Sequence, residues 1–265
     1  MTHLQYRLSK LGFRFGISGA HAARTMMLHE LRLLLAHTPA DAARPDYASA
    51  VVSDNVLGKP TQKARQLALR HLASLYGLDP ANPIFRALRR LWPLDESAQP
   101  LLALAMALAR DPLLRATQTF FLNQPVGGTV HRERIEQFLR TAFADRFSPA
   151  SLKSFAQNIS GTWTASGLLQ GHRRKTRAFV QAQPESVAFL LFLSYLEGRT
   201  GQRLFTSDWL NLPGCAPDEL ETLTSAASHR GILVFMNAGG VKEVRFPGYL
   251  NPEEERIRQE VSNVI

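Results

Sequence analysis

Residues 101–109 read LLALAMALA, nine apolar residues in succession between Pro100 and Arg110. A helix that spans a bilayer needs about 20 apolar residues, so this stretch predicts a helix buried on all sides in a globular core. A second apolar run, Val187–Leu196, predicts another core helix. Hydrophobic residues make up 45% of the 265 positions, which provides enough core for one large domain or two small ones.

Helical periodicity surrounds the first run and dominates the chain up to residue 145. Thr61 is suited to cap a helix that Gly77 ends, and Asn82-Pro83 opens another helix that stops at Pro93. Further helices are predicted from the apolar pattern at 26–35, 113–122 and 130–143. Residues 1–147 therefore predict a helical bundle without strands.

The sequence after Phe147 predicts a different arrangement. Ser148-Pro149 supplies the N-cap and first residue of a helix over 150–159, which Ser160-Gly161 is expected to interrupt before a second short helix ends near Leu169. Lys175–Gln181 is compatible with a strand. Helices follow at 185–197, 208–210 and 217–230, and the segments 232–236 and 241–246 predict a hairpin around Gly239-Gly240.

This order, helices followed by a hairpin, is typical of a winged helix. We therefore predict a mainly α protein. It comprises a helical bundle over 1–147, a helix-turn-helix or winged-helix-like α+β region over 148–250 with a basic segment at 172–177, and a C-terminal tail over 251–265. The helix in the recognition position carries Asp218, Glu219 and Glu221, which would repel a phosphate backbone. The module is therefore at least as well suited to contact a protein as to contact DNA.

The charge of the chain is strongly and unevenly basic. Lys and Arg number 31 against 22 Asp and Glu, which gives a net charge of +9 and a pI near 10.2. No carboxylate lies between Asp145 and Glu185, and the segment 172–177 within this window reads HRRKTR. Such a surface attracts phosphates, because no local negative charge offsets the attraction. A solvated basic loop is the alternative explanation.

Residues 1–29 and 55–78 also lack carboxylates, whereas the C-terminal part is acidic, as Glu253-Glu254-Glu255 illustrates. A basic body with an acidic end indicates separate contacts with a polyanion and with a protein; the codon bias of a GC-rich genome is the other explanation. The candidate DNA-binding residues are the cations of the basic stretches: Arg7, Lys10, Arg14, Lys59, Lys63, Arg65, Arg70, Arg146, Lys153, Arg173, Arg174, Lys175 and Arg177.

Short motifs of the sequence do not indicate an active site. The glycine pairs match neither a Walker loop nor a dinucleotide fingerprint, the serine–glycine pairs lack a hydrolase elbow, and His29-Glu30 lacks the second histidine of a zincin. The remaining carboxylates show no paired nuclease pattern. The motifs concerned are Gly127-Gly128, Gly239-Gly240, Ser18-Gly19, Ser166-Gly167, Asp111, Glu133, Glu136 and Asp145. We expect no catalytic residue, no metal ligand, no cofactor and no small-molecule substrate.

The single cysteine, Cys215, excludes an intramolecular disulfide and a thiolate zinc cluster, and fits a reducing cytoplasm. Neither apolar run is long enough to span a membrane, and no continuous apolar stretch follows the N-terminal cations as in a secretory signal. We expect a cytoplasmic protein without a membrane partner. Phe155, Trp163 and Phe179 near the basic segment could stack on bases, but core packing explains them better.

The order of these elements resembles the BrxA family of BREX phage-defence systems. The resemblance covers roughly residues 5–200 and rests on the order and spacing of apolar motifs. These motifs are a helix around Arg24–Leu35, the segment VSDNVL at 52–57, the basic helix Gln62–Tyr76, the helix pair over Leu101–Leu122 and the segment Ser148–Leu169. Members of that family are small, mainly helical proteins with a core similar to that of the transcription antitermination factor NusB, and they bind DNA without known catalysis.

From charge and resemblance together we expect a non-catalytic DNA-binding subunit of a bacterial BREX defence system. It would bind double-stranded DNA through its basic faces with little sequence preference, and would contact other defence-system proteins. Two alternatives remain. A NusB-like body could bind structured RNA by its shape and phosphates, or the protein could be an adaptor whose basic faces dock acidic proteins.

Overall fold

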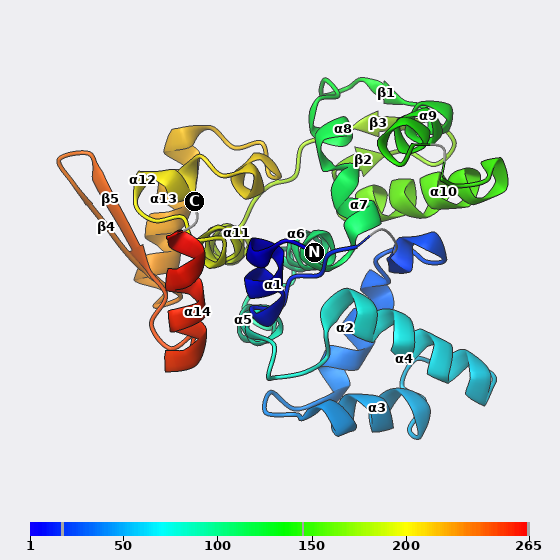
Figure 1. The fold of residues 1–265 in the computed structure, drawn as a ribbon, viewed down its shortest axis with the longest axis horizontal. Coiled ribbons are helices and arrows are strands. Elements are labelled where there is room, and N and C mark those ends of the chain that lie inside the picture. The colour runs from blue at the N-terminus through cyan, green and yellow to red at the C-terminus, as the bar shows by residue number, and fades with distance from the viewer. Residues whose placement is uncertain (17–18, 145, 264–265) are drawn as a thin grey trace.

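The computed structural model describes residues 1–16, 19–144 and 146–263. Two helices lie at the centre of the fold, α6 (Gln99–Arg110) and α11 (Pro184–Leu196), and they pack against each other (Figure 1). Every side chain over 101–109 and over 187–193 is at most 1% exposed. Helix α4 (Gln62–Tyr76) packs on α6, α13 (Pro217–His229) packs on α11, and α5 (Pro83–Leu91) packs on both. The apolar runs are therefore core helices, as the sequence predicts.

Further helices and two small sheets surround this pair in the described parts of the chain. The helices are α1 (His3–Lys10), α2 (Leu28–His37), α3 (Arg44–Val52), α7 (Pro112–Ala116), α8 (Gln118–Leu122), α9 (Arg132–Ala142), α10 (Pro149–Ala165), α12 (Gln202–Phe205) and α14 (Pro252–Ser262), with the 3-10 turns η1 (Ala20–Ala22) and η2 (Asp208–Asn211). The strands are β1 (Thr129–Val130), β2 (Leu169–Gln170), β3 (Lys175–Arg177), β4 (Val234–Ala238) and β5 (Val241–Arg245). The predicted fold class, a helical bundle followed by a small α+β module, is confirmed.

Local sequence signals set the boundaries of several helices. The side chain of Thr61 accepts the backbone N–H of Ala64 at the start of α4, and Gly77 follows α4 with a φ of 84°. Ser148 caps α10 in the same way. These residues begin and end the helices as predicted, because a cap satisfies backbone groups that lack a partner within the helix. Within the described ranges, no helix combines the length and the apolar character that crossing a membrane requires.

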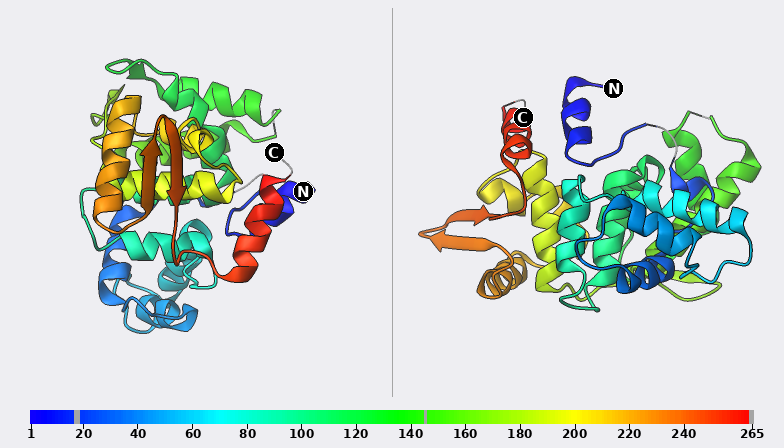
Figure 2. Two further views of the ribbon diagram at one scale, coloured as in Figure 1. Left: turned by 90° about the vertical axis from the view of Figure 1, so that its left-hand side faces the viewer. Right: turned by 90° about the horizontal axis from the view of Figure 1, so that it is seen from below.

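The hairpin β4–β5 extends from one end of the molecule (Figures 1 and 2). Its turn residues Gly239 and Gly240 have φ values of 59° and 85°, the left-handed conformation that a type I′ turn requires at both positions. On its inner face the ring of Phe235 lies 5.7 Å from that of Phe205. Lys242 forms an ion pair with Glu221 of α13, which ties the hairpin to the helix beside it.

The other sheet is antiparallel in the order β1–β3–β2. Its strand β3 is shorter than the predicted strand over 175–181, and β1 lies in a region for which only helices were predicted. Two- and three-residue strands give no alternating pattern in the sequence, so periodicity does not reveal β1.

The predicted interruption at Ser160-Gly161 is wrong, because α10 runs through it without a break. Gly161 lies where α10 presses against the N-terminal segment: a Cβ atom at this position would be only 2.9 Å from Cγ2 of Thr25. The glycine therefore permits close packing and does not end a helix. A helix pair over 148–169 does not exist.

The predicted division into regions 1–147, 148–250 and 251–265 does not follow the packing. Helices α9 and α10, which the first boundary would separate, pack against each other. The last region contains a helix, α14, which lies beside α1 (Figure 2). Nε of Arg7 lies 3.1 Å from the Glu260 carboxylate across that contact. One contiguous hydrophobic core joins all three regions.

A buried polar network ties the N-terminal segment to α7 and α10. Asp111 Oδ2 accepts the backbone N–H of His21 at 3.0 Å and lies 2.9 Å from Nδ1 of the same histidine ring. Nε2 of that ring lies 2.7 Å from Thr162 Oγ1, which accepts the Met26 N–H at 2.8 Å. Thr162 therefore has its own hydrogen free to donate to Nε2, which assigns the ring proton to Nδ1.

The network is closed to solvent, with His21 and Thr162 0% exposed and Asp111 1% exposed. Asp111 Oδ1 also accepts the N–H groups of Leu113 and Leu114 at 3.0 Å each, and so caps α7. Burial alone would raise the pKa of Asp111, but the hydrogen bonds that it accepts from the His21 ring and from the backbone of His21 and Leu114 outweigh burial and hold the pKa below its ordinary value. An Asp–His–hydroxyl array also occurs in hydrolases, but this one is enclosed, and we assign it a structural role.

We predict that His21→Ala lowers the free energy of unfolding by about 3–5 kcal/mol, because it leaves a buried carboxylate without its partner. The matched control is His37→Ala: the His37–Asp54 pair is 3.7 Å long and half exposed, so its loss should cost at most about 1 kcal/mol. Urea unfolding followed by circular dichroism measures both values. Equal losses in the two variants would contradict the role assigned to the buried network.

Candidate nucleic-acid interface

A tight turn presents the basic segment between β2 and β3. Gly171 has a φ of 97°, and a Cβ atom there would overlap the carbonyl oxygen of Arg174, so only glycine fits this turn. His172, Arg173 and Arg174 follow it and are exposed. The antiparallel sheet holds the turn beside the start of α9 and the middle of α10.

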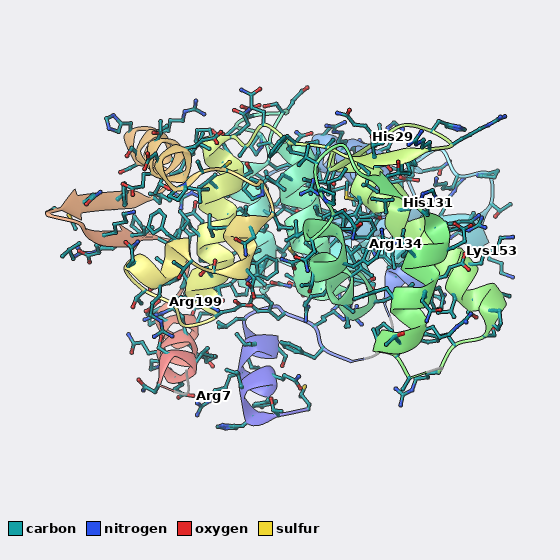
Figure 3. All side chains as sticks on the ribbon, turned by 90° about the horizontal axis from the view of Figure 1, so that it is seen from above. Arg7, His29, His131, Arg134, Lys153 and Arg199 are labelled. Atoms are coloured by element: carbon teal, nitrogen blue, oxygen red, sulfur yellow. The ribbon has the colours of Figure 1, made fainter. Side chains whose placement is uncertain are left out.

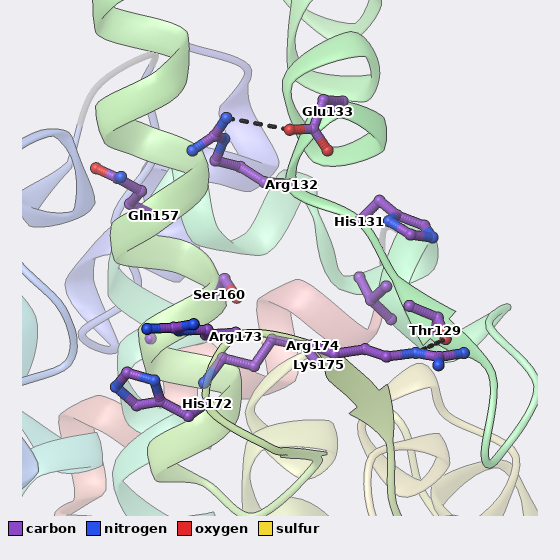
Figure 4. A pocket seen from close by; sticks show the side chains of 12 residues that line it. Thr129, His131, Arg132, Glu133, Gln157, Ser160, His172, Arg173, Arg174 and Lys175 are labelled. Carbon is purple, nitrogen blue, oxygen red and sulfur yellow. Dashed lines mark hydrogen bonds and ion pairs between the residues drawn. The ribbon is translucent and has the colours of Figure 1, made fainter.

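These elements enclose a hollow of about 570 Å³. Cations line it from two sides, and α10 supplies polar side chains on a third; the lining includes His131, Arg132, Gln157, Ser160, His172 and Arg173. In Figure 4, Arg173, Lys175 and His172 gather beside α10, whereas Arg174 extends toward Thr129. Arg132 enters from the α9 side.

The cations of the hollow differ in how many hydrogen bonds and ion pairs they form within the protein. His172 and Arg173 make no hydrogen bond or ion pair with any residue that the structure describes. Nε of Arg174 donates to Thr129 Oγ1 at 3.0 Å, and Nζ of Lys175 donates to the carbonyl of Gly171 at 2.6 Å. Both side chains keep further N–H donors for a ligand.

Arg132 is the most strongly neutralised of these cations. Its guanidinium lies 3.1 Å from the Glu133 carboxylate and 2.8 Å from that of Glu136. These two carboxylates thus act mainly on one arginine. Arg134 and Arg140 of the same helix are exposed and have no ion-pair partner among the described residues.

A second basic cluster lies at the same end of the molecule. Burial, followed by the positive charges of Arg24 and Arg70, lowers the pKa of His71. Helix α4, which carries Arg70 and His71, packs against the turn η1 just before Arg24. The contact of Gly161 with Thr25 brings the segment that carries Arg24 against α10. Helices α4 and α10 thus lie at one end of the fold, opposite the hairpin β4–β5 (Figure 1). We call the two clusters together the basic end.

Six of the candidate cations are exposed, and their side chains form no hydrogen bond or ion pair with a described residue: Lys10, Lys63, Arg70, Arg146, Lys153 and Arg173. Lys10 lies over the Tyr6 ring on α1, away from the basic end. Figure 3 likewise shows Arg7 apart from His131, Arg134 and Lys153, which lie together at the other side. The thirteen candidates therefore do not form one surface.

Four candidates are held by the protein itself. Arg7 pairs with Glu260, and Nζ of Lys59 lies 3.1 Å from the Glu30 carboxylate. Arg65 donates to the carbonyl of Val52 at 3.1 Å. Arg14, although exposed, donates to the hydroxyl of Ser74 at 2.6 Å. These side chains fasten segments together, which reduces their availability to a ligand.

Arg177 has to be removed from the candidates. Its side chain is 6% exposed and donates to the carbonyl oxygens of Leu168 and Ala178. Burial lowers the pKa of this guanidinium below its ordinary value. The sequence groups Arg177 with its exposed neighbours, but the backbone carbonyls that it satisfies belong to Leu168, directly before β2, and to Ala178, directly after β3. Sequence spacing does not show this contact.

Several residues of the basic end were missing from the predicted set: Arg24, His71, His131, Arg132, Arg134, Arg140 and His172. A count of exposed helix positions could have found Arg134 and Arg140. They were omitted because the candidates were taken from stretches without carboxylates, and α9 contains Glu133 and Glu136. Of the aromatic candidates, Phe155 and Trp163 are buried as expected, whereas Phe179 is 65% exposed beside Gly214.

The acidic helix α13 is only partly free to contact a partner. Asp218 and Glu219 are exposed on its first turn. Glu221, by contrast, accepts from Asn237 at 3.0 Å and pairs with Lys242, so it supports the hairpin. The expectation that all three carboxylates face a partner is therefore limited to the first two.

No family model and no curated protein matches this chain. The fold is similar to the crystal structure of a protein named SspB, with a TM-score of 0.54 and 12% sequence identity over 98% of this chain and 100% of that chain. At this identity the similarity concerns the fold alone. It extends over the whole chain, in agreement with the single core described above.

We predict that Arg177→Ala destabilises the fold by about 1–3 kcal/mol, because the carbonyls of Leu168 and Ala178 each lose the guanidinium donor and the Leu168 carbonyl keeps only the backbone N–H of Ala178. Arg173→Ala, four residues earlier and exposed, should leave the free energy of unfolding within about 0.5 kcal/mol of the wild type. Thermal and urea unfolding of the two variants compare them. If Arg177→Ala proves as stable as the wild type, the structural role is contradicted and Arg177 is again a candidate ligand-binding residue.

Proposed function

We propose that this protein binds duplex DNA, without catalysing a reaction, through the basic end of the molecule. The observation that carries the proposal is the separation of charge along the fold. Residues 129–177 hold nine Lys and Arg against three carboxylates, whereas residues 217–265 hold eight carboxylates against five Lys and Arg. The two groups lie at opposite ends of the long axis (Figure 1).

The local environment of these cations supports a polyanionic ligand. Two of the three carboxylates at 129–177 pair with Arg132 in a cluster of net charge −1, and the segment keeps an excess of six positive charges, nine minus three. Phosphates bind cations by long-range attraction and by release of counterions, which does not require a particular base sequence. A surface that is basic and polar therefore fits binding with low sequence preference.

The proposed biological role is that of a DNA-binding subunit of a bacterial anti-phage system. It rests on the resemblance of residues 5–200 to the BrxA family. The opposite end, where Asp218 and Glu219 are exposed, would contact another protein of the system. The outer face of the hairpin exposes Val234, Met236 and Val241, which suits a protein contact better than a nucleic-acid contact.

Deleting residues 182–265 is not a suitable test of this division of roles. The deletion would remove α11, which is buried against α5 and α6 in the core, and the remainder would not be expected to fold. Point variants on the two surfaces keep the core intact and separate the roles more cleanly.

We predict that the logarithm of the DNA affinity falls linearly with the logarithm of the salt concentration, with a slope of about −4 to −5, as expected for about five phosphate contacts. Replacement of Arg173, Arg174 and Lys175 by alanine should reduce the size of this slope by about 2 to 3 and weaken binding to all duplex sequences alike. Fluorescence anisotropy with labelled duplexes at several salt concentrations measures both effects.

The control removes the same number of cations from outside the basic end, by replacing the exposed residues Arg203, Arg245 and Arg256 with alanine. This variant should keep the wild-type slope. A slope near zero for the wild type, or an equal loss in both variants, would refute the proposed surface. Duplex RNA in the same titration tests the RNA alternative, and absence of binding to either duplex at low salt would favour the adaptor.

A further inference from the structure

The hollow beside α10 differs in shape from the rest of the basic end. Lys63, Arg70, Lys153 and Arg146 stand on open helical or loop surface. In the hollow, by contrast, cations converge on one volume of about 570 Å³ from α9 and from the turn before β3. Internal phosphates of a duplex lie on a convex backbone, which an open surface can contact. A concave site instead suits a chemical group that projects from the rest of the ligand.

The donors in the hollow suit a phosphate with several free oxygens. Arg173 offers a planar guanidinium group from the turn, and Lys175 adds an ammonium group. Arg132 faces them from α9, with its guanidinium paired to Glu133 and Glu136. Ser160 and Gln157 of α10 supply neutral donors at the same wall. A terminal phosphate monoester carries about −1.5 to −2 charges at pH 7 and three acceptor oxygens, whereas an internal diester carries a single charge. Converging cations therefore favour the monoester.

One carboxylate already occupies the rim of this hollow. The Glu133 side chain is 69% exposed and lies 3.1 Å from Arg132. Its own backbone N–H, which donates to the carboxylate, lowers the pKa of Glu133 below its ordinary value, so the group is ionised at neutral pH. The Glu133 carboxylate thus accepts hydrogen bonds from the backbone of α9 and from Arg132 that an anionic ligand would otherwise accept. Its negative charge also repels a phosphate. Its removal should strengthen binding.

We propose that this hollow binds a phosphate monoester, presented by the end of a DNA strand. The inference rests on the proposed function, and it names the part of the DNA that the hollow takes. The open surface around Arg70 and Lys153 holds internal phosphates, while Arg132, Arg173 and Lys175 hold the terminal one. A DNA end is then preferred over a continuous duplex.

The test compares short blunt duplexes of one sequence that carry a 5′-phosphate, a 3′-phosphate or only hydroxyl ends. Anisotropy at constant ionic strength should show about tenfold tighter binding of one phosphorylated duplex than of the hydroxyl duplex. Arg173→Ala should abolish that preference and keep most of the affinity for the hydroxyl duplex. Glu133→Gln should increase the preference several-fold, a gain that a merely structural role would not produce.

The matched control is Lys63→Ala, which removes one exposed cation from α4 and should weaken all duplexes by the same factor. Competition by inorganic phosphate and by deoxynucleoside monophosphates distinguishes the sources of the monoester. Millimolar concentrations of these competitors should be needed to remove the end preference. Displacement at the concentrations at which the DNA end itself binds would overturn the assignment to DNA in favour of a free nucleotide.

The two proposals fail in different ways. Equal affinity for phosphorylated and hydroxyl duplexes, with a normal salt dependence, would overturn the terminal-phosphate site and leave duplex binding standing. No binding of any duplex at low salt would overturn the proposed function, and with it the assignment to a DNA end. An end preference that survives Arg173→Ala and does not respond to Glu133→Gln would place the terminal phosphate outside this hollow.

Discussion

The buried contact between Asp111 and His21 is the constraint on which the arrangement of the basic end depends. A buried carboxylate is costly unless its oxygens are fully hydrogen-bonded, and Asp111 meets this condition only with His21 on one side and the first turn of α7 on the other. Gly19 allows the close approach, because a Cβ atom there would overlap the carboxylate. Thr162 then extends the network into α10. The N-terminal segment is thereby fixed between two helices that are distant from it in sequence.

This position of the N-terminal segment explains how separate basic stretches come together. Helix α10 forms the wall of the hollow through Gln157 and Ser160, and its next residue, Gly161, contacts Thr25 beside Arg24. Cations from the start of the chain, from α4 and from the turn before β3 thus share one end of the molecule. The acidic end lies across the core, and exposed charges separated by more than about 10 Å are largely screened at 0.1 M salt. The two ends can therefore engage different ligands without offsetting each other.

The sequence predicts features that depend on neighbouring residues. The caps at Thr61 and Ser148, the glycine after α4, the two apolar core helices and the hairpin turn all follow from local chemistry, and the structure has them there. Features that depend on distant residues were missed or misjudged. The sequence predicts a helix break at Gly161, but the structure shows that this glycine permits close packing against Thr25. The sequence likewise groups Arg177 with its exposed neighbours, but the structure shows it donating to the carbonyls of Leu168 and Ala178. The same holds for the hollow, whose walls come from three separate segments.

Hydrogen–deuterium exchange with and without saturating duplex DNA tests the central claim most directly, because it reports on both ends of the molecule in one experiment. The account predicts slower exchange of backbone amides over 129–137 and 168–177, and over the segments that carry Arg24 and Arg70, with no change over α13 and the hairpin β4–β5. Protection of α13 and the hairpin by DNA, with the segments around the hollow unchanged, would contradict it.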